Sequence, residues 1–208
     1  MHIPDGFLET RVWLSCWGLA VVYLTICLKR INRTLQEKFV PLMGVMAAFI
    51  FAAQMVNFPV LSGTSGHLLG AVLAAVLLGP YVAAIVISMV LVVQCLVFQD
   101  GGITALGANI VNMALVGVVS GYAAYYILRN IIKGNKGIIL GAALGSWFSV
   151  VAAASFCALE LAISGISPLR VVLPAMGLVH MVIGIGEAFI TTLVISFIIK
   201  IRPDLIYK

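Results

Sequence analysis

The chain opens with the octet MHIPDGFL, in which Met1 and His2 can chelate a metal ion together. If the terminal amine is free, it closes a five-membered ring on the metal with the His2 amide nitrogen, and that amide closes a six-membered ring with His2 Nδ1. These three nitrogens lie in one plane. An amide gives up its proton only to a metal that binds it strongly, which favours square-planar Ni(II) or Cu(II) over Zn(II), Mg(II) or Ca(II).

A fourth nitrogen would complete the square, and His67 is the other histidine that we expect on the same side of the membrane. Because binding displaces ligand protons, we expect it to weaken as the pH falls. The plainer alternative is that His2 is an exposed terminal residue and that His67 begins a helix, hydrogen-bonded near Ser65. In either case we expect both histidines at the aqueous edge of the protein.

Other polar residues fall in segments that we expect on the same outer side. Glu160, near the outer end of an apolar run, is predicted to hold an imidazole in one tautomer. Asn109 and Asn112 share a helix face. They either support the metal site or form hydrogen bonds between helices, and the sequence favours neither role over the other. The candidates for a supporting role around the metal are Ser65, Gln99, Asp100, Asn109 and Glu160.

Ionisable residues inside apolar runs cost at least roughly 2.5–3.5 kcal/mol to insert, so each is a functional candidate. His180 and Glu187 share a helix face about 10 Å apart along the axis. With Glu160 they can form a proton path, or they can be a hydrogen-bonded strut between helices, which we favour. The cysteines show no metal-binding spacing, and we expect them only to pack: Cys16, Cys27, Cys95 and Cys157.

The elements that must position these residues are membrane helices. The 208 residues are 63% hydrophobic and 9% charged, with a mean hydropathy of +1.20, which excludes a soluble globular protein. Apolar runs long enough to cross about 30 Å of hydrocarbon predict an all-α membrane protein with about seven helices in one bundle, forming a single domain over residues 1–208. The predicted spans are Val12–Leu28, Val40–Asn57, His67–Leu78, Tyr81–Phe98, Ile103–Leu128, Ile138–Ser164 and Val171–Lys200.

The basic residues predict the orientation. All of the 12 lysines and arginines except Arg11 and Arg170 fall on one side of a seven-span model, so we expect the N-terminus outside and the C-terminus in the cytoplasm. The net charge of +5 therefore reflects topology, and we expect no nucleic-acid partner. Residues 1–11 include Asp5 and Glu9, unlike a cleaved signal peptide, so we expect this extracytoplasmic segment to be retained.

Motifs for an energy source or a catalytic centre are absent from the sequence. There is no GxxxxGK[ST], HExxH or GxSxG, so we expect a transport subunit that is not an enzyme and depends on an ion gradient or on ATP hydrolysed by partners. In the second span, Gly44, Ala48 and Ala52 recur every four residues and make a smooth strip that a partner helix can approach. Other strips of this kind are expected to serve internal packing.

Three segments give the chain a resemblance to a known family. MHIPDGFL, AAFIFAAQMVNFPV continuing into SGTSGHLLG, and QDGGITALGANIVNM resemble the membrane S component of cobalt/nickel energy-coupling-factor (ECF) transporters, the CbiM/NikM group. Weaker motifs extend the resemblance through HMVIGIGEA, over essentially the whole chain. The octet combined with the His67 segment is the specific part.

The resemblance implies a subunit in a prokaryotic cell membrane that captures Ni(II) or Co(II) outside the cytoplasm. Its ligands would be the Met1 amine, the amide and imidazole of His2, and His67, in agreement with the ring geometry. It also implies a transmembrane coupling subunit, two cytoplasmic ATPases and often a small accessory membrane protein. The strip formed by Gly44, Ala48 and Ala52 would contact the coupling subunit. The family transports metal as its substrate and implies no organic cofactor.

The sequence is also compatible with two rival functions. The first is a proton-coupled secondary metal carrier that uses His180, Glu187 and Glu160. The second is a membrane enzyme or assembly factor that uses the metal structurally, although the sequence offers no nucleophile for it.

Overall fold

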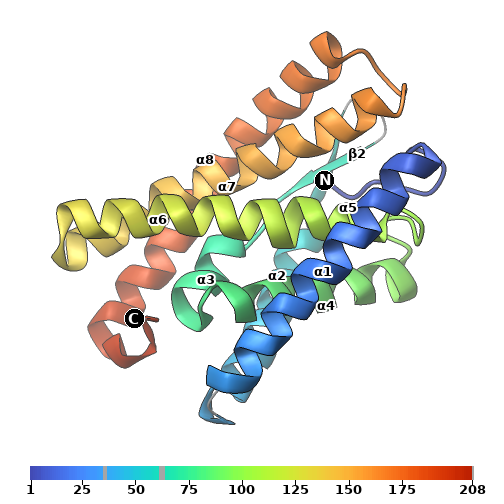
Figure 1. Cartoon of the computed structure of the whole chain (residues 1–208). Coiled ribbons are helices and arrows are strands. Elements are labelled where there is room, and N and C mark those ends of the chain that lie inside the picture. Colours follow the sequence, from blue (N-terminus) through green and yellow to red (C-terminus); the bar gives the residue numbers. More distant parts are fainter. Residues whose placement is uncertain (35–36, 61–63, 208) are drawn as a thin grey trace.

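The computed structural model describes residues 1–34, 37–60 and 64–207, and helices dominate it (Figure 1). In chain order the elements are α1 (Thr10–Thr34), η1 (Glu37–Phe39), α2 (Val40–Met55), β1 (Asn57–Val60), β2 (Thr64–His67), α3 (Ala71–Leu78), α4 (Pro80–Phe98), α5 (Leu106–Ile110), η2 (Val111–Gly117), α6 (Val118–Ile132), α7 (Gly134–Ile163), α8 (Leu169–Ile201) and η3 (Pro203–Leu205).

Within the described residues, five helices are long and apolar enough to cross a membrane. They are α1, α4, the continuous helix Leu106–Ile132 that joins α5, η2 and α6, then α7 and α8. The 16 residues of α2 reach about 24 Å, somewhat short of the hydrocarbon thickness. The prediction of an integral membrane protein built from helices is therefore confirmed.

The predicted third span was wrong in its length and start. The helix α3 begins at Ala71, four residues after His67, and has eight residues, so it rises only about 12 Å and cannot cross a bilayer. All eight residues are buried, which makes α3 a half-helix inside the bundle. The predicted break at Gly79 and Pro80 is confirmed, because α4 begins directly at Pro80.

A β-hairpin replaces the start of that span, where the sequence predicted a helix. Strands β1 and β2 pair antiparallel, with Asn57 opposite His67 and Val60 opposite Thr64. Pairing satisfies the backbone groups of a non-helical segment that enters the bundle, as an apolar environment requires. His67 is thus the last residue of a buried strand, and the expectation that it begins a helix is wrong.

The helix from Leu106 to Ile132 carries a π-helical segment, η2, at Val111–Gly117. Such segments are rare and often lie at functional sites. Here the wider turn follows Asn109 and contains Asn112. The two amides consequently have different partners, as described below.

Glycines allow α6 and α7 to pack closely. A Cβ at Gly145 would lie 2.7 Å from the Gly121 carbonyl oxygen, so the two backbones come too near for any side chain there. Ser149 adds a hydrogen bond from its Oγ to the Gly117 carbonyl, at 2.7 Å. These small-residue strips serve internal packing, as predicted.

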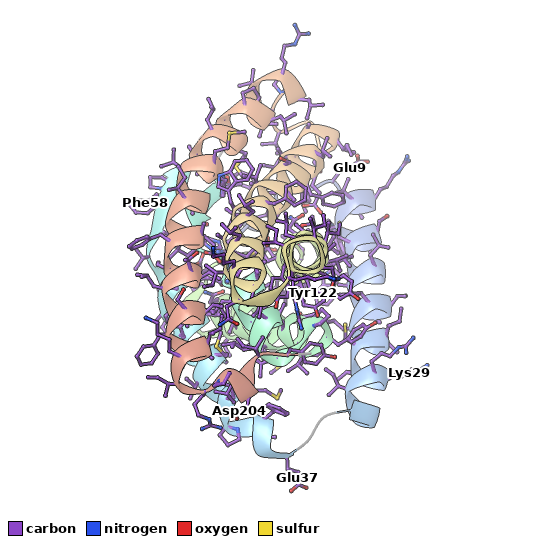
Figure 2. The ribbon with its side chains drawn as sticks, turned by 90° about the vertical axis from the view of Figure 1, so that its left-hand side faces the viewer. Glu9, Lys29, Glu37, Phe58, Tyr122 and Asp204 are labelled. Atoms are coloured by element: carbon purple, nitrogen blue, oxygen red, sulfur yellow. The ribbon has the colours of Figure 1, made fainter. Side chains whose placement is uncertain are left out.

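The outer faces of the helices are apolar, which suits a lipid environment. On α8, Val182, Ile185 and Phe189 are 64–70% exposed. Figure 2 shows Lys29 and Glu37 toward one end of the molecule and Glu9 toward the other. The chain therefore has an apolar belt with charged residues toward its ends.

Candidate metal centre

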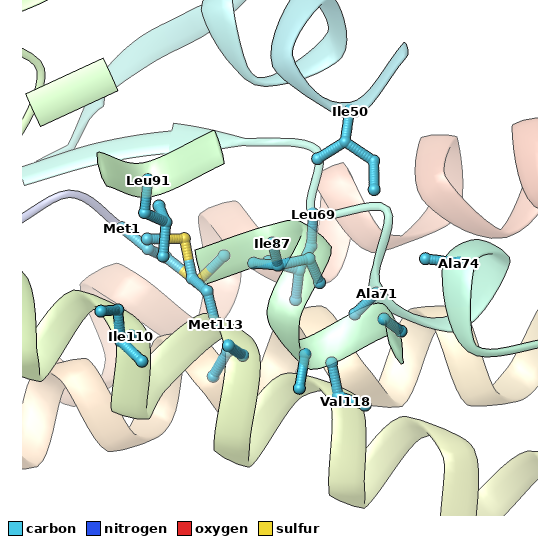
Figure 3. Close-up of a cluster of buried hydrophobic side chains, with 14 of the residues drawn as sticks. Met1, Ile50, Leu69, Ala71, Ala74, Ile87, Leu91, Ile110, Met113 and Val118 are labelled. Carbon is cyan, nitrogen blue, oxygen red and sulfur yellow. The ribbon is translucent and has the colours of Figure 1, made fainter. Parts of the chain in front are cut away.

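The first three residues fold into the protein. Met1 and Ile3 have no exposed surface and His2 is 4% exposed, although we expected His2 at the aqueous edge. The Met1 side chain belongs to a buried apolar cluster that includes Leu91 and Met113 (Figure 3). Its burial fixes the position of the terminal amine.

The backbone of Ile3 is held on both of its polar groups. Asn109 Oδ1 accepts a hydrogen bond from Ile3 N at 2.9 Å, and Asn109 Nδ2 donates to the Ile3 carbonyl at 3.3 Å. Gly102 N also donates to that carbonyl, at 2.9 Å. A Cβ at Gly102 would lie 2.2 Å from the Asp5 nitrogen, so only glycine lets the N-terminal segment cross the loop here.

Asp5 anchors the same segment from its other end. Its carboxylate accepts hydrogen bonds from Ile103 N at 3.1 Å and from Thr104 N at 2.8 Å. The Thr104 hydroxyl also donates to it, and these bonds lower the pKa of Asp5, with the hydroxyl the largest cause. The polar octet is therefore explained in two parts: His2 faces the site, and Asp5 ties the segment to the loop.

The terminal amine contacts Ser65 of β2. It donates to the Ser65 carbonyl, and it lies 3.2 Å from Ser65 Oγ, which also accepts from the His2 amide at 3.3 Å. Burial lowers the pKa of the amine to about 5, against the smaller opposing effects of Cys157 and Asp100. At neutral pH the amine is therefore unprotonated, with a lone pair available.

Gln94 of α4 fixes the tautomer of His2. Gln94 Oε1 can only accept, so His2 Nε2, 3.0 Å away, carries the proton. His2 Nδ1 is buried and has no hydrogen-bond partner. Burial first, and then the charge of the amine, lower the pKa of His2 to about 3. The ring is neutral, and its free lone pair is on the nitrogen that chelation requires.

His67 has the complementary tautomer. Its Nδ1 donates to the Leu68 carbonyl at 2.7 Å, which leaves Nε2 unprotonated, and that buried nitrogen has no partner. The His2 and His67 rings lie side by side, with centroids 4.6 Å apart. Burial is the main reason why the pKa of His67 lies well below its ordinary value. Partners of this kind on the second ring nitrogen orient metal-binding histidines in general.

Asp100 lies at the mouth of this centre. Its Oδ1 is 3.5 Å from His2 Nδ1, but the pair is no salt bridge because His2 is neutral. Asn57 Nδ2 lies 3.5 Å from the other carboxylate oxygen. Burial raises the pKa of Asp100, while the terminal amine and Asn57 act in the opposite direction.

Gln99 lines the same mouth but holds no imidazole. It ends α4 in a left-handed conformation, with φ of 56°, and its side chain is exposed. Of the predicted supporting residues, the structure therefore brings four to the N-terminal segment or the mouth: Ser65, Gln99, Asp100 and Asn109.

Glu160 does not contact an imidazole, contrary to the prediction. Its carboxylate accepts from Asn112 Nδ2 at 2.6 Å and from Cys16 Sγ at 3.2 Å. The wider π-helical turn directs Asn112 to α7 while Asn109 holds Ile3. Cys16 thus makes a hydrogen bond in addition to packing, and Glu160 joins α1, η2 and α7.

His180 and Glu187 have separate partners. The Glu187 carboxylate accepts from Leu69 N at 2.8 Å and from Gly70 N at 2.6 Å, so it joins α8 to the start of α3 as a strut. His180 Nδ1 donates to the Met176 carbonyl within its own helix, at 2.7 Å. The strut interpretation therefore fits Glu187 but not His180.

Sequence reasoning missed Gln94 and the Leu68 carbonyl. Gln94 is an uncharged polar residue inside the apolar run of α4, and that signal was available. The Leu68 carbonyl carries no sequence signal. Among the described residues, no group of three or more His, Cys, Asp or Glu has metal-ligand spacing. The candidate set instead combines two imidazoles with two main-chain nitrogens.

The sequence matches a known family. Residues 2–205 match the family model CbiM, described as the cobalt uptake substrate-specific transmembrane region. The chain belongs to the CbiM family. A CbiM-family relative in Archaeoglobus fulgidus, which carries the name of a fused nickel transport protein, NikMN, is 44% identical over 99% of this chain and 68% of its own length.

Other comparisons agree with this assignment to the CbiM family. A Methanosphaerula palustris protein that carries the name of a cobalt transport protein, CbiM, is 28% identical over the whole chain and 91% of its own length. A crystal structure titled as a truncated transition metal transporter is 36% identical and superposes with a TM-score of 0.90, over 96% of this chain and 99% of that one. The resemblance seen in the sequence is therefore confirmed, and so is the fold of the chain as that of a transition metal transporter.

Proposed function

We propose that this chain is the substrate-specific membrane subunit of an ATP-driven nickel/cobalt uptake system. It would hold Ni(II) or Co(II) through the Met1 amine, the His2 amide nitrogen and Nδ1, and His67 Nε2. The single observation that carries the proposal is the juxtaposition of two of the three buried, unpartnered ring nitrogens, His2 Nδ1 and His67 Nε2, on rings 4.6 Å apart beside a neutral terminal amine; the third is His180 Nε2.

Buried polar atoms without a partner are uncommon, because each costs about 1–3 kcal/mol. A bound cation would satisfy both ring nitrogens at once. The tautomers are already set by Gln94 and Leu68, so the site needs little rearrangement to bind. Such preorganisation supports a site for an ion over a site that is merely well packed.

The amide proton is the one that binding must still displace. Ser65 Oγ accepts a hydrogen bond from that amide at 3.3 Å. The nitrogen lone pair that the lost proton frees would bind the metal, so this hydrogen bond would be lost as the ion enters.

The ATP-driven part of the proposal rests on partner subunits. A transmembrane coupling subunit, two cytoplasmic ATPases and a small accessory membrane protein would complete the system. In support, the strip of Gly44, Ala48 and Ala52 is exposed on α2, and among the described residues nothing outside the neighbouring turns of α2 lies within 4 Å of a Cβ placed on Gly44. A smooth exposed strip allows a partner helix to approach closely.

Orientation follows from the same proposal. The metal centre would face the outside of a prokaryotic cell membrane, and the C-terminus would lie in the cytoplasm. The basic residues support this orientation, because those at the C-terminal ends of α1, α6 and α8 would then lie on the cytoplasmic side.

The decisive experiment blocks the terminal amine. Intact-mass measurement first verifies a free Met1, and Ni(II) and Co(II) are then titrated before and after Nα-acetylation. We expect acetylation to abolish high-affinity binding. The control protein is acetylated while metal is bound, and the metal is then removed. In this control the lysines are modified, whereas the bound metal protects the terminal amine. Equal affinity of the Nα-acetylated and control proteins would refute the ligand set.

Coupling is tested separately on α2. Gly44→Leu and Ala48→Leu should leave metal binding intact and abolish ATP-dependent uptake by the assembled complex. Gly18→Leu is the matched control, since Gly18 is an exposed glycine on α1 with open space around it. Loss of uptake in the control as well would show that leucine at any exposed helix position disrupts the assembly.

A further inference from the structure

An open cavity of about 340 Å³ lies directly above the metal centre. Within the part of the chain that the structure describes, Asp100 contributes the one carboxylate of its lining. His2, Ser65 and Asn57 line it as well, so the cavity extends from the surface to the ring of a candidate ligand. At roughly 30 Å³ for each water molecule, it has room for a metal ion with its hydration shell.

Two acceptor atoms lie close together where this cavity meets the metal centre. His2 Nδ1 is unprotonated, because Nε2 donates to Gln94, and Asp100 Oδ1 lies 3.5 Å from it. The ring is only 3% exposed, whereas the Asp100 side chain is 19% exposed. No proton lies between the two atoms, and their lone pairs repel each other unless a cation joins them.

We propose that Asp100 is the entry ligand of this transporter: it binds the hydrated metal ion first and transfers it to His2 Nδ1. This inference rests on the proposed function and extends it to the route by which metal arrives. Donors at about 2.1 Å from one ion and at right angles lie about 3 Å apart, so an ion in this cavity can touch both atoms with a small movement.

Each step of the transfer exchanges ligands and balances. The Asp100 carboxylate replaces one water of the hydrated M(II) ion, and His2 Nδ1 replaces a second. The amine, the His2 amide nitrogen and His67 Nε2 follow, with the amide proton passing to water in the cavity. Each of these nitrogens replaces a water, and Asp100 and any remaining water then leave the ion, because four nitrogens complete the square.

The loop holds the carboxylate in place for this role. Asp100 N donates to the Gln94 carbonyl at 3.0 Å, so one residue supports both the entry ligand and the tautomer of His2. Gly101 follows with φ of +92°, and a Cβ there would lie 2.9 Å from Asn109 Nδ2 and 3.5 Å from the His2 ring. The turn therefore places the carboxylate at the mouth without covering His2.

An entry ligand affects the rate of association. A carboxylate in an open cavity above the metal centre raises the local concentration of cations, and such electrostatic steering accelerates association roughly 10–1,000-fold. Because salt screens the charge, the advantage should shrink as ionic strength rises. A residue that only held the His2 ring in position would instead slow the dissociation of the bound metal.

Stopped-flow measurement of Ni(II) binding to the purified full chain tests the proposal. We expect Asp100→Asn to lower the association rate constant about tenfold at low ionic strength and to flatten its salt dependence. Asp100→Glu, which keeps the charge, should restore most of the rate. Glu9→Gln removes the same charge from an exposed site outside the cavity and should leave the rate near that of the wild type.

The outcomes separate this inference from the proposed function. A wild-type protein that binds no nickel would overturn both. Normal wild-type binding with an unchanged association rate in Asp100→Asn would overturn the entry role alone, as would a change confined to the dissociation rate. If Asp100→Asn does not fold, failure of Asp100→Glu to associate at a near-normal rate would overturn it as well.

Discussion

Asn109 brackets Ile3 with both ends of its side-chain amide, accepting from its nitrogen at 2.9 Å and donating to its carbonyl at 3.3 Å. The two residues are 106 positions apart, and the Asn109 amide makes the two hydrogen bonds to the Ile3 backbone that a neighbouring strand would make. Through this contact the middle of the chain determines where Met1 and His2 lie. The metal centre therefore depends on a residue that would not itself touch the metal.

Asn109→Ala should detach the N-terminal segment. It leaves the buried Ile3 N–H without its acceptor, at about 1–3 kcal/mol, while the Ile3 carbonyl keeps its hydrogen bond from Gly102 N, so we expect nickel affinity to fall roughly 10–100-fold in a folded protein. Isothermal titration measures the affinity. Asn112→Ala is the matched control, because that amide bonds Glu160; an equal loss of affinity there would argue against a specific role for Asn109.

A two-residue extension before Met1 should abolish binding. It moves the amine away from the ring of His2, and Met1 has no exposed surface, so the extra residues have no room inside. The loss should exceed the roughly 10–100-fold that removal of an outer partner costs. Uptake and titration are compared before and after a protease removes the extension. Full uptake by the uncleaved protein would contradict the prediction.

Gln94→Leu should weaken nickel binding by roughly 10–100-fold without unfolding the protein. Without the acceptor at 3.0 Å, the His2 proton is no longer confined to Nε2 and the ring is free to turn. Gln94→Glu keeps an acceptor and should bind more tightly than the leucine variant. Nitrogen NMR chemical shifts of His2 report the tautomer; an unchanged tautomer in Gln94→Leu would show that another contact fixes it.

Nickel binding should release about one proton between pH 6 and 8, and so weaken about tenfold for each unit of fall in pH. The folded protein depresses the pKa of the amine from 8.0 to about 5 and that of His2 from 6.5 to about 3, so both are already deprotonated in this range. Only the amide proton remains to be displaced. A free peptide with the same first residues should release more protons.

Proton release is measured by titration calorimetry in buffers of different ionisation enthalpy. Burial lowers the pKa of the amine, so docking of the N-terminal segment is most favourable at high pH. As the pH falls from about 8 toward 5, the undocked amine takes up a proton that the docked amine does not, and docking becomes less favourable. Release of two or more protons by the protein would mean that the amine or an imidazole is charged before metal arrives.

Glu187→Ala should destabilise the protein by about 2–4 kcal/mol, because two backbone N–H groups at the start of α3 lose a buried acceptor. Glu187→Gln retains one acceptor oxygen and should lose less. Thermal unfolding in detergent measures both variants. If Glu187→Ala melts like the wild type but stops transport, the proton-path hypothesis would regain support.

The class of the protein and the proposal that Met1 and His2 chelate a metal came from the sequence alone. A chelate ring depends on covalent spacing, so this proposal needs no knowledge of the fold. Apolar run length likewise reports membrane helices directly. His67 was included in the proposed ligand set because we expect it on the same side of the membrane as the N-terminus, and the family resemblance implies the same ligand.

Tertiary structure decided which nitrogens are free and how they are held. The tautomer of His2 depends on Gln94, 92 residues away, and the burial of Met1 depends on a core assembled from several helices. Sequence periodicity also could not show that α3 is a buried half-helix, because an apolar run looks the same whether protein or lipid surrounds it. Contacts between residues far apart in the chain decide the tautomer, the burial of Met1 and the position of α3. The spacing of residues along the sequence does not reveal such contacts.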